Sequence, residues 1–143
     1  MSFTAGGTRR WTSPELLHPE RFGANDDRPT KKSDCYALGM VVYEVRLGVT
    51  GVLPGVLGLT ISQVLSGNSP FWHIENPGAV ILAITKGRRP EKPDTAESLG
   101  FTDDLWKTLQ QCWSTDFNAR PDVRTILCHL NHAAWSWGRR RSV

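Results

Sequence analysis

The sequence predicts an all-helical fold, and three observations lead to that prediction. Apolar residues recur at helical spacing in several segments, Pro and Gly mark the breaks between these segments, and no segment of any length alternates as a strand does. At 143 residues the chain is long enough for one domain with a core but too short for two. Its 39% hydrophobic and 22% charged residues are ordinary for a soluble globular protein.

The first predicted helix is short and covers residues 13–17. Ser13 can cap its start, Pro14 suits the first helical position, and Glu15 places an acid in the first turn. Residues 18–30 are rich in Pro, Gly, Asn and Asp, so they are predicted to form a surface loop.

Residues 31–45 predict the core helix of the domain. Lys32 or Ser33 lies near its start, and Asp34 in the first turn suits the helix dipole. Apolar side chains occur nearly all round this segment, which is typical of a buried helix rather than a surface one.

Three further helices are predicted towards the C-terminus. They begin at Asn76-Pro77-Gly78, at Thr102-Asp103-Asp104 and near Pro121, and Lys86-Gly87 predicts the end of the first. Their apolar residues recur at helical spacing: Val80, Ile81, Leu82 and Ile84; Leu105, Trp106, Leu109, Cys112 and Trp113; Val123, Ile126, Leu127 and Leu130. We expect the two tryptophans of the middle helix to be core aromatics.

The charge and cysteine content favour a cytoplasmic protein without nucleic-acid partners. The net charge of +3 is small, and much of it lies in Arg139-Arg140-Arg141, a tail too short to predict nucleic-acid binding. The three cysteines are odd in number and lack CxxC spacing, so neither a zinc site nor a disulfide framework is predicted. No signal peptide is visible at the N-terminus.

Four short motifs follow one another along the chain. They are Gly7-Thr8 to Ser13-Pro14-Glu15; Ser33-Asp34 to Gly39-Met40; Pro70-Phe71 ahead of the Asn76 helix; and Cys112-Trp113 with Asn118-Ala119-Arg120-Pro121. In this order they resemble the C-terminal part of the large lobe of protein kinases. Trp11 with Cys112-Trp113 resembles the tyrosine-kinase-like branch of serine/threonine kinases. The resemblance implies a partial kinase domain over residues 1–134, followed by a basic tail over 135–143.

The resemblance also implies roles for single residues. Gly7, Thr8 and Trp11 match the substrate-docking loop of the family. Glu15 and Arg120 match a buried ion pair that pins this loop to the last helix, and such a pair costs about 3–5 kcal/mol to break on one side.

Asp34 and Thr4 match functional positions of the kinase family, but their roles in this chain stay open. In the family, the aspartate at the place of Asp34 holds the catalytic-loop backbone. Here it is alternatively a plain helix-capping acid or, without that loop, a buried carboxylate with no partner. Thr4 is a candidate phosphorylation site because the family places activating phosphates near this position.

The groups that transfer phosphate in the kinase family are not found in these 143 residues. The sequence contains no glycine-rich loop with an Ala-x-Lys strand, no His-Arg-Asp loop and no Asp-Phe-Gly. We therefore assign no catalytic or metal-binding residue and expect no cofactor in this chain, whereas the intact family uses ATP and Mg²⁺. The resemblance predicts a fragment of a serine/threonine kinase that is inactive alone and marginally folded. The alternative is a non-catalytic interaction module for protein substrates or kinase partners.

Residues 46–64 interrupt the resemblance. No charged residue occurs from Leu47 to Ile74, a length that approaches the ~20 apolar residues of a membrane span. Four glycines and a proline nevertheless make the segment a poor helix, at roughly 1 kcal/mol per Gly and 3 kcal/mol per Pro. Without it Val45 would join Leu65 as in the kinase family. We predict an insertion, either a surface loop or translated non-coding sequence; a membrane tether is the less favoured alternative, so membrane association is not expected.

Overall fold

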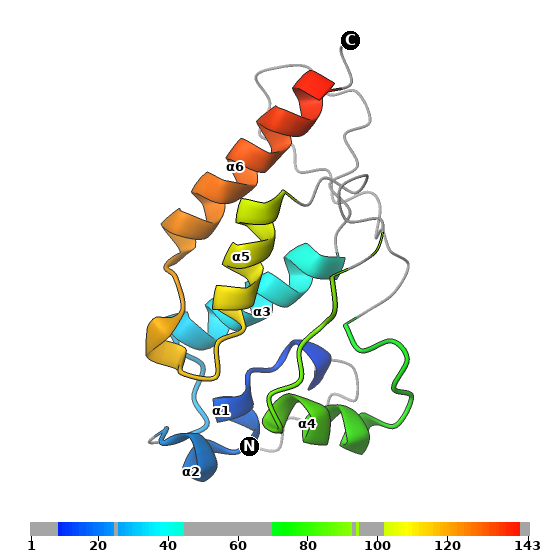
Figure 1. The fold of residues 1–143 in the computed structure, drawn as a ribbon. Helices are drawn as coiled ribbons and strands as arrows, with labels where there is room; N and C mark the ends of the chain where they lie inside the picture. Colours follow the sequence, from blue (N-terminus) through cyan, green and yellow to red (C-terminus); the bar gives the residue numbers. More distant parts are fainter. Residues whose placement is uncertain (1–8, 25, 45–69, 93, 95–101, 141–143) are drawn as a thin grey trace.

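The computed structural model describes residues 9–24, 26–44, 70–92, 94 and 102–140, and every regular element in this part of the chain is a helix (Figure 1). The all-helical prediction is confirmed for these residues. In chain order the elements are η1 Arg9–Trp11, α1 Pro14–Leu17, α2 Pro19–Phe22, α3 Lys31–Glu44, α4 Pro77–Thr85, α5 Asp103–Cys112, η2 Phe117–Ala119 and α6 Val123–Arg140. The predicted insertion at 46–64 lies outside the described residues.

The central helix α3 begins with a reciprocal cap. The Thr30 backbone N–H donates to Ser33 Oγ at 2.7 Å, and the Ser33 N–H donates back to Thr30 Oγ1 at 3.1 Å. Both Tyr36 and Met40 are fully buried, as expected for the core helix. Burial does not extend all round, because Val41 is exposed on the opposite side.

The close approach of α3 and α5 depends on a glycine. A Cβ at Gly39 would lie 2.8 Å from Cys112 Cβ and 2.8 Å from Trp113 Nε1, so no larger residue fits without displacement. Trp113 also packs edge-on against Trp106 at 5.8 Å between ring centroids and against Tyr43 at 5.9 Å. Trp113 is buried and Trp106 half-buried, so the two tryptophans are core aromatics as predicted.

The remaining helix starts are set by local caps. Asn76 Oδ1 accepts hydrogen bonds from the N–H groups of Gly78 and Ala79 at the start of α4, and Thr102 Oγ1 accepts from Leu105 N at the start of α5. Both starts agree with the sequence prediction.

Two predictions about the loops and the tail need correction. The predicted loop at 18–30 contains α2, because Pro19 suits a first helical position and Gly23, at φ +70°, ends the turn in the left-handed region. The basic tail predicted from residue 135 is helical as far as Arg140, since α6 continues through it. Cationic side chains stabilise the C-terminal end of a helix, which favours this extension.

The packing places α5 and α6 side by side, with α1, α2 and α4 at one end of the pair. Figure 1 shows α5 alongside α6, with α3 crossing beneath them and α1, α2 and α4 gathered below α3. Ile126 and Ala133 of α6 are fully buried in the shared core. None of the described helices is both long and apolar enough to span a bilayer.

Candidate functional site

The segment from η1 to α1 contains the described part of the predicted substrate-docking loop. Arg10 fastens this segment to the turn at residues 70–74. Its guanidinium donates to the carbonyl oxygens of Pro70, Phe71 and Ile74 at 3.1, 2.5 and 2.7 Å. Phe71 has a φ of +57°, a strained backbone conformation for a bulky residue, and the three hydrogen bonds from Arg10 hold the turn in that conformation.

A second attachment joins η1 to the end of α3. Trp11 Nε1 donates to Glu44 Oε2 at 3.0 Å, and both residues are half-buried. Trp11, which the sequence placed in the docking loop, is therefore held by α3. Gly7 and Thr8 of the same predicted loop, and the candidate phosphorylation site Thr4, lie outside the described residues and stay predictions.

The third attachment is the ion pair between Glu15 and Arg120. Arg120 Nη1 lies 2.6 Å from Glu15 Oε1 and Nη2 lies 2.8 Å from Oε2, which is the bidentate arrangement of a strong carboxylate–guanidinium pair. The side chains are 0% and 6% exposed for Arg120 and Glu15 respectively. The structure thus brings together the two residues that the sequence paired across most of the chain.

The rest of the Arg120 guanidinium is also satisfied. Its Nε donates to the Ser114 carbonyl at 3.0 Å and its Nη1 donates to the Lys32 carbonyl at 2.9 Å, while Lys32 Nζ donates back to the Arg120 carbonyl. Burial acts to raise the pKa of Glu15, but the hydrogen bonds and charge of Arg120 outweigh burial, and the pKa is lowered from its ordinary value. The ion pair therefore joins α1, the start of α3 and the segment before α6.

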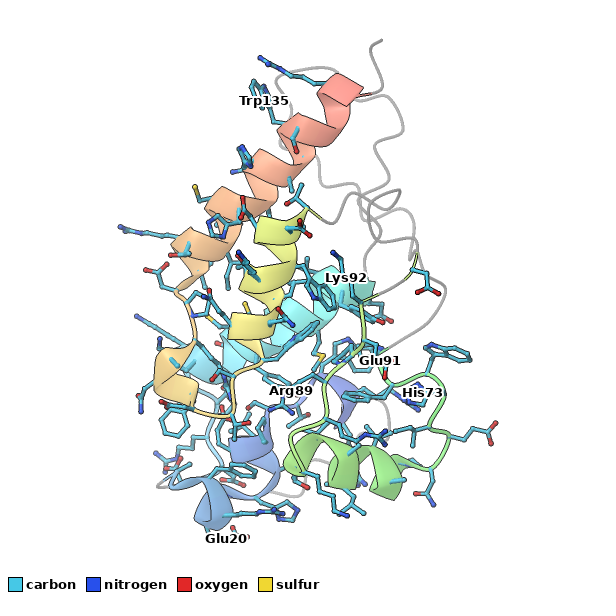
Figure 2. All side chains as sticks on the ribbon, in the orientation of Figure 1. Glu20, His73, Arg89, Glu91, Lys92 and Trp135 are labelled. Atoms are coloured by element: carbon cyan, nitrogen blue, oxygen red, sulfur yellow. The ribbon has the colours of Figure 1, made fainter. Side chains whose placement is uncertain are left out.

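Arg89 is a half-buried cation whose contacts the sequence does not predict. Its Nε donates to the Trp113 carbonyl at 2.6 Å and its Nη1 to the Ile84 carbonyl at 3.0 Å, so it links α4 to the end of α5 (Figure 2). Burial lowers the pKa of this guanidinium. A basic dipeptide in a proline-containing loop is typical of a solvated surface, so its sequence gave no sign of these contacts.

Tyr36 lies between the buried Arg120 and the half-buried Arg89. The guanidinium carbon of Arg120 is 5.0 Å from the centroid of its ring, and that of Arg89 is 5.5 Å away, both within cation–π range. Burial raises the pKa of Tyr36 to about 12. The Tyr36 ring therefore stabilises both guanidinium groups, whereas the Glu15 carboxylate pairs with Arg120.

Asp34 is exposed on the first turn of α3, so the alternative of a buried carboxylate is wrong. Its backbone N–H donates to the Thr30 carbonyl at 2.9 Å, as in an ordinary first helical turn. The Asp34 carboxylate is therefore accessible at the surface of the described residues.

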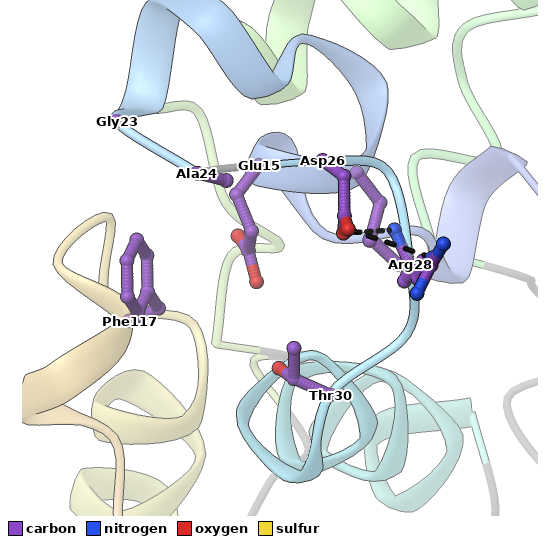
Figure 3. A pocket seen from close by; sticks show the side chains of 8 residues that line it. Glu15, Gly23, Ala24, Asp26, Arg28, Thr30 and Phe117 are labelled. Atoms are coloured by element: carbon purple, nitrogen blue, oxygen red, sulfur yellow. Dashed lines mark hydrogen bonds and ion pairs between the residues drawn. The ribbon is translucent and has the colours of Figure 1, made fainter.

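A cavity of about 270 Å³ lies beside the ion pair (Figure 3). It is lined by Glu15, Leu16, Gly23, Ala24, Asp26, Arg28, Thr30 and Phe117. Two carboxylates face one guanidinium there, and Arg28 Nε is already 3.5 Å from Asp26 Oδ2. This charge pattern does not suit phosphate groups.

No group of three or more His, Cys, Asp or Glu side chains gathers among the described residues in a way that would hold a metal ion. No residue of the described part is therefore assigned to a metal ion.

Comparison with known families identifies the family of the chain. The family model of protein tyrosine and serine/threonine kinases matches residues 4–130. The chain belongs to this protein kinase family. Its described helices accordingly form part of the C-terminal helical lobe of a kinase domain, and its relatives include serine/threonine kinases.

The relatives are much longer proteins. The chain is 32% identical over 130 residues to a probable serine/threonine-protein kinase of Dictyostelium discoideum, which covers 90% of this chain and 7% of that protein. It is 27% identical over 124 residues to the serine/threonine/tyrosine-protein kinase HT1 of Arabidopsis thaliana, covering 87% of this chain and 24% of HT1. It is also 27% identical over 122 residues to a receptor-type guanylate cyclase of Caenorhabditis elegans, covering 81% and 8%.

Proposed function

We propose that this segment serves as the substrate-docking part of a serine/threonine protein kinase domain, with protein substrates as its partners. The observation that carries the proposal is the threefold attachment of residues 9–17. Arg10 attaches them to the 70–74 turn, Trp11 to Glu44, and Glu15 to Arg120. A docking loop has to keep its shape while a protein substrate binds, and attachments at three points provide that rigidity.

We propose also that the 143 residues do not transfer phosphate on their own. Phosphoryl transfer needs a lysine on the phosphates, Asp and Asn on Mg²⁺, and an Asp that accepts the hydroxyl proton. The motifs that supply these groups do not occur in the sequence. In the kinase family ATP supplies the transferred phosphoryl group and Mg²⁺ neutralises its charge. Asp34, exposed in the first turn of α3, would hold the catalytic loop of an intact domain.

A chimaera tests this proposal. The chain replaces the matching segment of the Arabidopsis kinase HT1, and transfer of labelled phosphate to a protein substrate is measured. We expect activity from the chimaera and none from the chain alone. Glu15→Ala should abolish most of the activity, whereas Glu20→Ala, an exposed acid in the neighbouring α2, should not. Phosphate transfer by the chain alone, or an equal loss in both variants, would contradict the proposal.

A second candidate function is a non-catalytic interaction module. The observation that favours it is the exposure of two large apolar side chains near the docking loop, Trp72 at 57% on the turn held by Arg10 and Leu82 on α4. A similar segment also occurs in a relative whose name is that of a guanylate cyclase.

Binding without catalysis distinguishes the two candidates. The isolated chain is immobilised, and its affinity for a protein substrate of the chimaera is measured by interferometry. A module should bind with no nucleotide present, and Trp72→Ala with Leu82→Ser should weaken binding at least about ten-fold. The exposed Leu127→Ser on α6 serves as the control. A chain that does not fold, or binding that ignores both substitutions, would remove this candidate.

A further inference from the structure

We propose that the C-terminal end of α6 lies on an anionic membrane surface, with Trp135 and Arg139 seated among the lipid headgroups. This inference is independent of the kinase function and concerns a helix that lies on a bilayer, not one that spans it. It departs from the expectation that the chain has no membrane association, and three observations on α6 carry it.

The first observation is the distribution of charge. Residues 123–143 contain Arg124, Arg139, Arg140 and Arg141 and no Asp or Glu. This segment therefore carries a formal charge of +4, which leaves −1 on residues 1–122 because the whole chain carries +3. The entire positive excess of the chain lies on its last helix and the residues after it, where it would attract anionic lipids.

The second observation is the environment of Trp135. Its side chain is 57% exposed, although Ala133, two residues earlier, is fully buried. Two residues correspond to about 200° around a helix, so Trp135 faces away from the core that Ala133 enters. Figure 2 shows Trp135 on the outer side of α6, away from α5. Exposed tryptophan in an otherwise charged region is typical of membrane interfaces, where the indole lies at headgroup level.

The third observation is the contact between Trp135 and Arg139. The guanidinium carbon of Arg139 lies 3.7 Å from the centroid of the Trp135 ring, one helical turn later. An aromatic ring and a cation on one face can enter the interface together, since the stem of arginine is apolar and its head binds phosphate.

A helix-dipole role for Arg139 and nucleic-acid binding by α6 each explain fewer of these three observations. Arg139 near the end of α6 stabilises the helix dipole, but the dipole accounts for neither the exposed indole nor the absence of acids over residues 123–143. A nucleic acid would require a groove or a series of stacking platforms, and the described part of α6 offers one exposed indole on a convex helix. A planar lipid surface matches this shape and charge better.

Vesicle sedimentation of the full chain tests the proposal. We expect binding to vesicles of phosphatidylcholine with about one third phosphatidylserine, none to pure phosphatidylcholine, and release by raised salt. Substitution of Arg139, Arg140 and Arg141 by Ser should weaken binding on the order of a hundred-fold, at about five-fold per arginine. Trp135→Ala should weaken it on the order of ten-fold.

The control removes the same charge from another face. Lys31, Lys86 and Arg88 are exposed, and their joint replacement by Ser should change binding by less than about five-fold. Circular dichroism follows the helix content of each variant. If the serine variant loses helix, replacing the three tail arginines by Lys keeps the charge and must restore binding.

Several results would overturn the proposal. They are equal binding to neutral vesicles, no binding to anionic vesicles at low salt, an equal loss in the control, and failure of the lysine variant to bind. Tighter binding to polyuridylate than to anionic vesicles at the same salt would also overturn it, because the surface would then belong to a nucleic acid.

Discussion

Two ion pairs of this chain have similar lengths but opposite surroundings. Arg120 Nη1 lies 2.6 Å from Glu15 Oε1, with 0% and 6% of the two side chains exposed. Lys92 Nζ lies 3.0 Å from Asp103 Oδ1, with 37% and 87% exposed. Water screens the second pair, whereas the groups of the first have only protein partners. The buried pair is therefore the one of the two that can fix the proposed docking segment to the residues before α6.

Arg120→Met should have the largest effect and tests this difference directly. Glu15 would stay buried without its partner, so the chimaera should lose about 3–5 kcal/mol of unfolding free energy. Denaturant titration measures the loss, and Lys92→Met is the matched control. We expect no change in the denaturation midpoint for Lys92→Met. An equal loss of unfolding free energy in both variants would show that the buried pair is no more stabilising than the exposed one.

Arg10→Met comes next, because it removes three hydrogen bonds from a half-buried charged donor. We expect a loss of about 1.5–3 kcal/mol, with faster hydrogen exchange in residues 70–74. Arg9→Met is the control, since Arg9 is the exposed neighbour in the same short helix. Unchanged exchange in the turn would mean that Arg10 does not hold it.

Trp11→Phe keeps the aromatic ring but deletes the Nε1 donor to Glu44. The expected loss is about 1 kcal/mol, measured again by denaturant titration. Trp72→Phe, at a side chain 57% exposed, should be neutral. A larger loss of unfolding free energy for Trp72→Phe than for Trp11→Phe would contradict a stabilising role of the Trp11–Glu44 hydrogen bond.

The smallest expected effect is a pH dependence. The pKa of Glu15 is lowered below its ordinary value of 4.5 in the folded protein, so the ionised pair contributes its full stability above about pH 4.5. This contribution is lost as the pH falls through the folded pKa, because the unfolded chain binds the proton first. Unfolding of wild type and Glu15→Gln between pH 7 and pH 3 measures the difference, which should shrink below pH 4.5. A difference in unfolding free energy that stays constant from pH 7 to pH 3 would contradict a lowered pKa for Glu15.

Local sequence signals predicted the helices well. Asn76 and Thr102 mark helix starts through hydrogen bonds to residues two or three positions away, and these can be read from sequence. The turn α2 was missed because Pro19 and Gly23 resemble loop residues while they also begin and end a helical turn. The apolar repeat of the last helix ends at Leu130, so the sequence does not predict that α6 continues to Arg140.

The site was only partly predictable. The pairing of Glu15 with Arg120 came from the resemblance to kinases, since 105 residues separate the two and no local pattern joins them. Arg89 and Arg10 bind backbone carbonyls of distant segments, and a carbonyl carries no sequence signature. Cations that bind backbone in this way can be recognised only once the fold brings the segments together.

A double-mutant cycle on Glu15 and Arg120 measures whether the buried ion pair holds the proposed docking segment in place. Unfolding free energies are measured for the chimaera, for Glu15→Gln, for Arg120→Met and for both together, with phosphate transfer assayed in parallel. We expect a coupling of about 2 kcal/mol or more and a loss of transfer in each single variant. Additive losses within about 0.5 kcal/mol, with transfer unaffected, would show that the pair does not hold the docking loop.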